Sequence, residues 1–296
     1  MLRRDVLLGV SALVSVGRRL AGASTNYTAE IAEWRKNYDR DLRSEKGPLW
    51  LIARNNVPEG KTGIGSDPSN RVALPDRAPK FVGTIERQGS KVNFVPAAGN
   101  AVTLNGKPRS GPLVVQAGVT SKPGDKLAFG DFEIAISEAG GQYQLTVRDQ
   151  QSPYVKQFHG AVWYAVDPRY RVPGAFTPYP EPKELRVADT SGRTRTRIAR
   201  GYVTFRLNGE SLHLEPVAVD GIFFFMFKDV TTGHGTYPVG RFLDADVPKD
   251  GKVIMDFNKA YNPYCAFNPY SSCPIPPKYN TLTTRVEAGE KYSGAH

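Results

Sequence analysis

The side chains of this chain that are best able to do chemistry are concentrated between Asp229 and Glu290. His234, Asp256 and Cys265 supply a base, a carboxylate and a thiol, which are the groups that a nucleophilic cysteine mechanism uses. They are therefore the catalytic candidates for a hydrolase-type reaction. Whether the chain is an enzyme stays open, because spacing along the sequence fixes no distance between these groups.

The same stretch is rich in groups that bind polar molecules. An arginine with carboxylates can grip an anionic or polar ligand, and amides beside tyrosines suit a ligand such as a sugar. The candidates for binding a small polar or anionic ligand are Tyr237, Arg241, Asp256, Asn258, Asn262, Asn280 and Glu290. The structural alternative is a buried charge network of Arg241, Asp256 and Glu290, with the asparagines forming turns.

Cys265 and Cys273 are the two cysteines of the chain, and seven residues separate them. In an oxidising compartment they are candidates for a disulfide, which would contribute about 2–3 kcal/mol by closing so small a loop. A reactive thiol and a metal site with His234 are the alternatives. Because this cysteine spacing is not a zinc pattern, we assign no metal, and the sequence identifies no cofactor.

Residues 1–23 have the properties of a signal peptide. Arg3 and Arg4 precede a short apolar segment, Val6–Val16, and the run Ala21-Gly22-Ala23 is an A-x-A cleavage pattern. The start of the segment, residues 3–8, resembles a twin-arginine export signal. That resemblance implies transport of the folded protein to the periplasm or cell envelope. The alternative is a cytoplasmic N-terminal helix.

The composition excludes several classes of protein. Apolar residues make up 40% of the chain and aromatic residues 10%, which is too much for a disordered chain. No apolar run reaches the roughly 18–20 residues of a spanning helix, so we expect no integral membrane span.

The net charge of +10 falls to about +7 without the four Arg and one Asp of the first 24 residues. An exported protein of this charge meets anionic envelope surfaces rather than nucleic acid.

Arg193, Arg195 and Arg197 alternate with threonines and would project from one face of a strand. They form either an anion-binding ridge or an edge strand that its charge protects from pairing. No aromatic residue is interleaved with them, so the stacking that nucleic-acid binding requires is not indicated.

The elements that must position these residues are mainly β-strands. A short N-terminal helix is expected over residues 25–46, where Ile31, Trp34, Tyr38 and Leu42 fall on one helical stripe. Short strands separated by turn residues follow, which is typical of a sandwich or barrel. The predicted parts are a β-sandwich (49–150), a proline-rich and aromatic linker (151–182), a C-terminal β domain with the candidate site (183–290) and a tail (291–296).

Turn and strand motifs recur between residues 60 and 140. They are the residues 63–70, 72–75, 105–106 and 124–130. Together they resemble a forkhead-associated domain, which implies an eleven-stranded sandwich that binds phosphothreonine peptides. Ser66, Pro79 and Val82 stand where that family has its phosphate-gripping Arg and its Ser and His. The resemblance therefore implies the fold, while phosphopeptide binding is not expected.

A second set of motifs runs through nearly the whole chain. Its members are Trp34, the residues 47–51, 160–164 and 236–243, Asp256-Phe257-Asn258, Asn262-Pro263, Cys265-Ala266-Phe267, Cys273-Pro274, Pro276-Pro277, Asn280 and Ala288-Gly289-Glu290. They resemble domain-of-unknown-function family 1684. The resemblance implies one continuous protein but no activity. A structural or interaction module of the cell envelope is thus a third functional hypothesis, beside ligand binding and hydrolysis.

Overall fold

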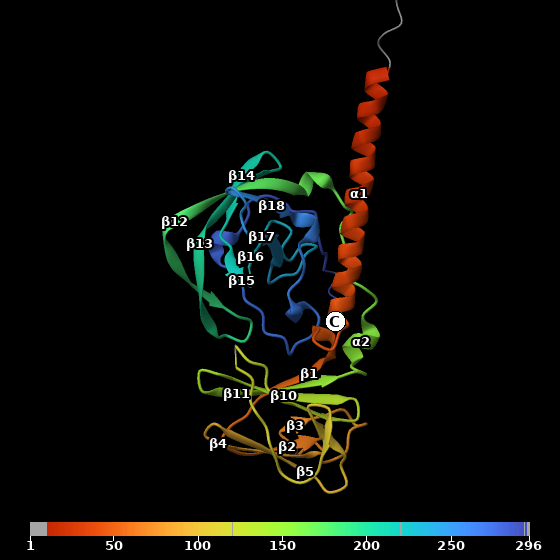
Figure 1. Cartoon of the computed structure of the whole chain (residues 1–296), viewed down its shortest axis with the longest axis vertical. Coiled ribbons are helices and arrows are strands. Elements are labelled where there is room, and N and C mark those ends of the chain that lie inside the picture. Colours follow the sequence, from red (N-terminus) through yellow and green to blue (C-terminus); the bar gives the residue numbers. More distant parts are fainter. Residues whose placement is uncertain (1–10, 120, 220, 293, 295–296) are drawn as a thin grey trace, which may run out of the picture. The chain divides into compact units, whose positions relative to one another are not determined.

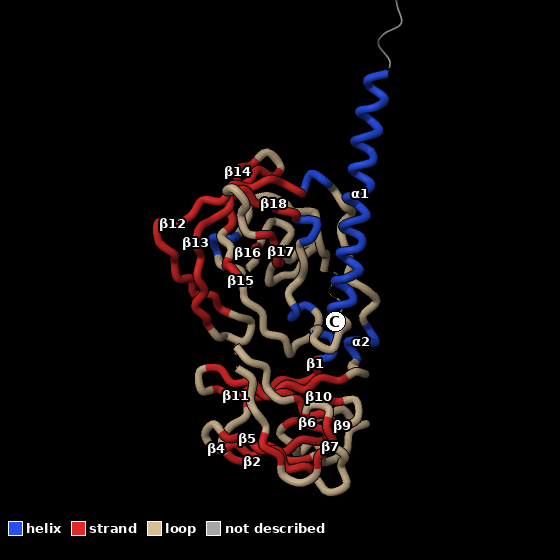
Figure 2. The backbone as a smooth tube through the Cα atoms, in the orientation of Figure 1, coloured by secondary structure: helices blue, strands red, loops and turns tan. Residues whose placement is uncertain are grey.

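The computed structural model describes residues 11–119, 121–219, 221–292 and 294, with side chains described from residue 26 onward. Arg3 and Arg4 of the predicted export signal lie outside the described residues. The protein is mainly β, with one N-terminal helix and several antiparallel sheets, as predicted (Figures 1 and 2). Its described residues divide into two compact units, each with strands and a core of its own.

The two units are each assembled from separate stretches of the sequence. Among the described residues, unit 1 comprises those within 11–40, 160–266 and 273–294. Unit 2 comprises the described residues within 41–159 and 267–272. The last stretches of the chain therefore return to units that began much earlier in the sequence.

The helix α1 spans Ser11–Leu42, so it starts earlier and ends sooner than the helix expected over residues 25–46. At its end the amide and the hydroxyl of Ser44 both donate to the carbonyl of Asp41, at 3.2 and 2.7 Å. A serine that takes this carbonyl competes with continuation of the helix. Ile31 of the predicted apolar stripe is fully buried.

Unit 2 contains two sheets. One has the strand order β1-β11-β10-β9-β6-β7 and the other β3-β2-β4-β5-β8. The strand bounds are β1 Leu51–Asn56, β2 Gly60–Gly65, β3 Val72–Ala73, β4 Gly83–Gln88, β5 Lys91–Pro96, β6 Val102–Leu104, β7 Lys107–Arg109, β8 Leu113–Val114, β9 Lys126–Phe129, β10 Phe132–Ala139 and β11 Gln142–Asp149. Alternating residues of both sheets, such as Ile85 and Ile134, enter one core. The forkhead-associated resemblance of this unit stays a prediction.

Unit 1 has two further sheets, ordered β14-β13-β12-β18 and β15-β16-β17. The strand bounds are β12 Arg171–Ala188, β13 Thr194–Leu207, β14 Glu210–Leu214, β15 Val217–Val219, β16 Ile222–Phe227, β17 Arg241–Asp246 and β18 Lys252–Asp256. Side chains from both sheets, among them Phe205, Phe225 and Met255, form a common core. Between β13 and β14, Asn208 and Gly209 adopt positive φ angles of 51° and 85°, as the Asn-Gly dipeptide favours in a two-residue hairpin turn.

The linker expected over residues 151–182 is replaced by secondary structure at two places. The short helix α2 spans Pro153–Gln157, and residues from Arg171 onward belong to β12. Pro180 and Pro182 fit the strand because pairing with β13 is interrupted between Pro178 and Lys183, where no backbone N–H is required. The C-terminal β domain therefore begins before residue 183.

The tail predicted over residues 291–296 begins as an ordered part of unit 1. Lys291 N donates to Val162 O at 2.7 Å, and Tyr292 N donates to Gly235 O at 3.0 Å. Backbone pairing of this kind needs no sequence signature, which is why composition did not reveal it.

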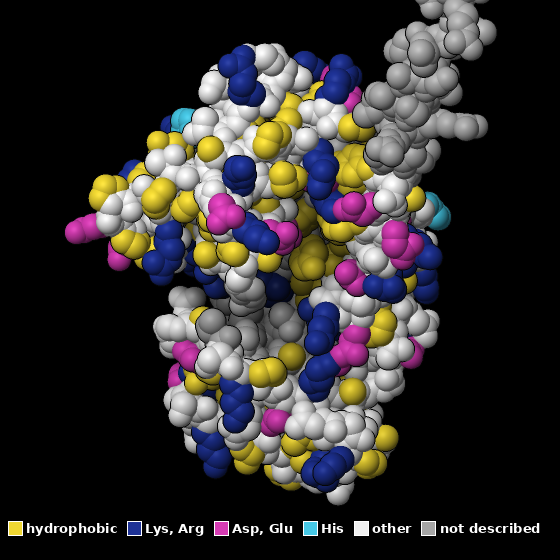
Figure 3. Space-filling model, turned by 45° about the horizontal axis from the view of Figure 1, so that its top comes forward, with side chains coloured by type: hydrophobic (Ala, Val, Ile, Leu, Met, Phe, Trp, Pro, Cys, Tyr) yellow, Lys and Arg dark blue, Asp and Glu magenta, His cyan; other side chains and the backbone are white. Residues whose placement is uncertain are grey.

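The charged side chains are spread over the visible face, with acidic groups lying among the Lys and Arg side chains (Figure 3). Within the described part of the chain, no helix is long and apolar enough to cross a membrane.

Candidate functional site

The candidate residues all belong to unit 1. They lie in β17 and β18 or in the segments that follow β16, β17 and β18. Tyr237 lies in the loop between β16 and β17, and Arg241 is the first residue of β17. Asp256 ends β18, and a 3-10 turn, Phe257–Lys259, follows directly. The remaining candidates lie in the irregular segment after this turn. Tyr237 lies beside the cysteines, and the structure separates the other six binding candidates into four groups with different partners.

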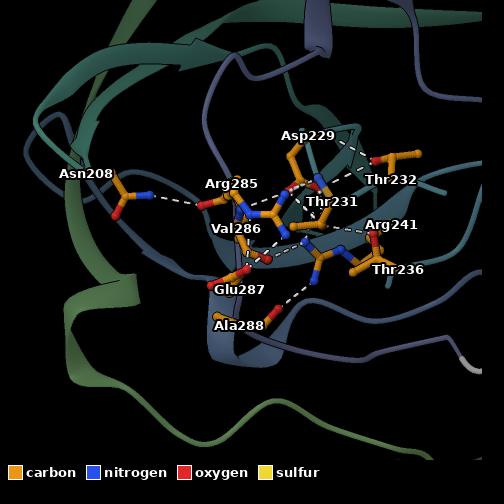
Figure 4. A network of polar contacts seen from close by, with 10 residues as sticks. All are labelled: Asn208, Asp229, Thr231, Thr232, Thr236, Arg241, Arg285, Val286, Glu287 and Ala288. Carbon is orange, nitrogen blue, oxygen red and sulfur yellow. Dashed lines mark hydrogen bonds and ion pairs between the residues drawn. The ribbon is translucent and has the colours of Figure 1, made fainter. Parts of the chain in front are cut away.

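The first group is a buried ion pair between Arg241 and Asp229 (Figure 4). Arg241 Nη2 lies 3.2 Å from Asp229 Oδ1 and donates to Val286 O at 2.8 Å, while Nη1 donates to Ala288 O. Asp229 Oδ2 in turn accepts from Val286 N at 2.8 Å. The pair therefore fixes the returning segment 286–288 through its backbone.

Asp229 is also bonded from its own loop. Thr231 donates from both its amide and its hydroxyl to the carboxylate, and the Thr231 hydroxyl lies 3.0 Å from that of Thr236 (Figure 4). Burial lowers the pKa of the Arg241 guanidinium, and the Asp229 carboxylate opposes this effect. The predicted network of Arg241, Asp256 and Glu290 is therefore wrong in its partners. Arg241 is paired with Asp229, while Asp256 and Glu290 bond to other residues.

The second group surrounds Asp256. Tyr27 of α1 donates to Asp256 Oδ1 at 2.7 Å, and Arg171 Nε lies 3.7 Å from Oδ2. Asn258 donates from Nδ2 to Asp167 O at 2.8 Å and accepts from Asp167 N at 3.0 Å. These bonds hold the helix and the chain before β12 against the end of β18. They are structural contacts, which favours the turn-forming alternative for Asn258.

Asn280 forms a third group by itself. Its Oδ1 accepts from Glu215 N, and its Nδ2 donates to the carbonyls of Glu215 and Met226, all within 2.9–3.0 Å. The side chain is fully buried and both ends of its amide are used by backbone groups. Asn280 therefore joins the C-terminal segment by hydrogen bonds to β16 and to the residue that follows β14.

The fourth group is centred on Glu290, whose side chain is buried. Its Oε2 accepts from Asn262 N at 2.7 Å and from the Tyr38 hydroxyl at 3.1 Å. Burial raises the pKa of the Glu290 carboxyl to about 8, although these hydrogen bonds favour the ionised form. The carboxyl is consequently mainly protonated at neutral pH.

Gly289 makes the position of Glu290 attainable. It has a φ of 77°, and a Cβ there would stand 2.5 Å from Ala260 O. Without that Cβ, Glu290 N donates to Ala260 O at 2.8 Å. A glycine is required for this close approach.

Aromatic side chains lie around the Glu290 group. The Tyr38 ring is 5.5 Å from Trp163, 5.6 Å from Trp34 and 5.6 Å from Tyr261, between ring centroids. All four rings are half-buried and therefore reach solvent. Next to them, Asn262 Oδ1 is buried without a hydrogen-bond partner in the described structure. We call Tyr38, Trp163, Tyr261, Asn262 and Glu290 the Glu290 site.

The two cysteines lie beside each other in a smaller core of unit 1, and the structure records both as free thiols. Cys265 N lies 3.2 Å from Cys273 Sγ. The hydrogen bond from the Cys273 thiol lowers the pKa of Cys265 to about 7, and it raises that of Cys273. Tyr237 donates to Cys265 O at 3.0 Å, so its hydroxyl supports the cysteine loop.

The catalytic candidates have separate surroundings. His234 is exposed in a turn, where its backbone N donates to Thr231 O. Asp256 is engaged by Tyr27, and Cys265 by Cys273. In the part of the chain that the structure describes, no group of three or more His, Cys, Asp or Glu side chains could hold a metal ion.

The stripe on the predicted helix indicates packing for Trp34 and Tyr38, and no sequence pattern indicates a role at the site for Tyr27 or Trp163. Tyr27 and Tyr38 join α1 to residues more than two hundred positions later, namely Asp256 and Glu290. The available signal was the pair of aromatic residues four positions apart on a helix, which places two rings on one face.

Two comparisons with known proteins returned matches. The family described as "Protein of unknown function (DUF1684)" matches residues 156–291. Among solved structures, an uncharacterized protein of Haloarcula marismortui, determined by solution NMR, is 35% identical in sequence. The match covers 48% of this chain and 80% of that one, with a TM-score of 0.41. None of the curated proteins matches.

Proposed function

The chain belongs to DUF1684, a family of proteins of unknown function, and from this premise we propose that it binds a small polar ligand at the Glu290 site. The observation that carries the proposal is a buried acid beside a buried amide oxygen that has no partner. Asn262 Oδ1 costs free energy unless a hydrogen-bond donor reaches it. A ligand hydroxyl would supply that donor.

The rings of the site favour a ligand with both hydroxyl groups and apolar faces. Trp163 and Tyr261 are half-buried, and each contacts Tyr38. Aromatic rings pack against apolar faces of a ligand, while a tyrosine hydroxyl and a protonated carboxyl offer donors. A neutral sugar combines these properties. An anion is less suitable, because Arg241 already holds Asp229.

Tryptophan fluorescence offers a direct test, since Trp163 of the site and the adjacent Trp34 are two of the three tryptophans in the chain. Titration with glucose, N-acetylglucosamine and their oligomers should give a saturable change in emission for at least one sugar. Trp163→Phe should weaken that binding about threefold, since phenylalanine has a smaller ring for stacking.

Trp50→Phe is the matched control, because Trp50 belongs to unit 2. It should leave the dissociation constant unchanged. The proposal fails if the folded protein gives no saturable response to the sugars in fluorescence and in calorimetry. It also fails if Trp50→Phe weakens binding as much as Trp163→Phe does.

A structural or interaction role is the second candidate function. It is favoured by the groups whose polar atoms are already used inside the protein, above all Arg241 with Asp229 and Asn280 with Glu215. Nothing comparable favours the hydrolase alternative, because His234, Asp256 and Cys265 have separate partners.

We further propose that the protein works in the periplasm or cell envelope after twin-arginine export.

A further inference from the structure

The outer face of the sheet β14-β13-β12 carries an unusual set of exposed side chains. Residues that pair directly across antiparallel strands project to the same side, and neighbours along a strand alternate. Arg186 pairs with Thr196, and Arg206 pairs with Ser211. Buried residues such as Leu185 and Phe205 project to the opposite side, into the core. Arg186 and Arg206 therefore share the solvent side of the sheet.

Arg200 and Tyr202 belong to the same side. Ala199, Gly201 and Val203 alternate with them along β13 and are buried. Tyr202 is half-buried, and its ring lies 5.9 Å from that of His213 on β14. The face thus combines arginines with an amphipathic ring.

The face also exposes an aliphatic residue. Ile198 is 43% exposed and pairs with Glu184. We define the basic sheet face by Arg186, Arg200, Arg206, Ile198 and Tyr202. Glu184 is the acidic residue that the strand register places among them.

The charges of this face are available to a partner. Arg186 and Arg200 are exposed, and the described structure shows no ion pair for either of them. Arg206 donates to the nearby carbonyl of Gly209, a contact that leaves its charge uncompensated. Exposed cations of this kind hold anions by charge complementarity rather than by stabilising the fold.

We propose that the basic sheet face docks on an anionic phospholipid surface. Side chains on one side of a sheet project together, so several of them can meet a planar surface at once. Arginines attract acidic headgroups, while Ile198 and Tyr202 have the apolar and amphipathic character that suits the bilayer interface. A linear polyanion would favour a groove lined with cations and stacking rings instead. This inference is independent of ligand binding at the Glu290 site.

Vesicle co-sedimentation tests the proposal with the full chain. The protein should bind vesicles of mixed phosphatidylglycerol and phosphatidylcholine, and added salt should weaken the binding. Arg186→Gln with Arg200→Gln should lower the partition coefficient about 20-fold, since each cation near an anionic surface contributes about a factor of five. Vesicles of phosphatidylcholine alone, which lack anionic headgroups, should bind the protein much more weakly. Residues 1–23 are the same in every variant, so their contribution cancels when the variants are compared.

Arg195→Gln with Arg197→Gln is the matched control. These residues lie on the same strand β13, but they pair with the buried residues Val187 and Leu185 and therefore project to the opposite side. The control removes the same charge and should reduce binding by less than about threefold. Equal losses in the two double variants would overturn the proposal. So would failure to bind anionic vesicles by a protein that binds the soluble polyanion heparin.

Discussion

Glu290 shows at the scale of one residue how burial sets chemistry. Its carboxyl is buried beside Asn262 and Tyr38, and its pKa is raised from 4.5 to about 8. In the unfolded chain the same carboxyl ionises near its ordinary pKa. Folding therefore keeps a proton that the unfolded chain has already lost in this range of pH.

The sign of the resulting pH dependence follows from linkage. Between pH 4.5 and 8 the folded state binds more protons at Glu290 than the unfolded state does. The free energy of unfolding should then fall as the pH rises, by at most about 1.4 kcal/mol per pH unit from this group. Urea denaturation across this range should show the slope, and Glu290→Gln should remove this part of it.

Glu287→Gln is the control for this prediction. Glu287 is exposed and paired with Arg285 on the surface, only three residues away. It should leave the slope as it is in the original protein. An identical slope in the original protein and in Glu290→Gln would contradict the raised pKa.

Cys265 and Cys273 allow a second prediction at this scale. The half-buried Cys265 has a pKa of about 7, so it should react with iodoacetamide faster than the buried Cys273. Mild oxidation should join the two sulfurs, because Cys273 Sγ already lies 3.2 Å from Cys265 N. Peptide mapping by mass spectrometry with and without reductant would detect the bond. Oxidised dimers in place of an internal disulfide would contradict the prediction.

At the scale of elements, α1 is joined to remote segments of unit 1 by polar contacts. Tyr27 donates to Asp256, Arg35 donates to Tyr164 O, and Tyr38 donates to Glu290. The helix is therefore an integral element of unit 1. Tyr27 lies four positions after the predicted cleavage site at Ala23, so processing would leave these contacts intact.

Tyr27→Phe tests the importance of this helix. The substitution removes the donor to Asp256 and should lower the free energy of unfolding by about 2 kcal/mol, since the lost bond reaches a carboxylate. Asn26→Ala changes the exposed neighbouring residue and should have little effect. Thermal or urea denaturation of the two variants gives the comparison. Equal stabilities would mean that the N-terminal part of α1 contributes little to unit 1.

Local patterns predicted some elements better than others. The hairpin at Asn208-Gly209 was predictable, because positive φ angles at two successive residues favour this dipeptide. The first half of β12 was not, because its prolines are typical of a linker. It is a strand because β18 pairs with residues 171–175 and β13 pairs with residues 174–178. Pairing between distant segments has no local signature in either of them.

At the scale of the whole molecule, export is the prediction with the widest consequences. Arg3→Lys with Arg4→Lys should leave the protein in the cytoplasm if it uses the twin-arginine route. Lysines keep the positive charge that general secretion needs, so export by that route would persist. Cell fractionation with immunoblotting separates the two results. Arg18→Lys with Arg19→Lys is the control at the other end of the signal. This variant should be exported like the original protein.

The sequence by itself determined the mainly β fold, the membership of DUF1684 and the stretch of chain in which the candidate residues gather. These properties follow from composition, alternation and motifs, which are local. The tertiary structure decided which groups meet. It paired Arg241 with Asp229 and placed Glu290 with Tyr38, while Asp256 went to Tyr27. The physical reason is that burial and distance depend on how remote segments pack, and these two quantities set both the pKa of a group and its partners.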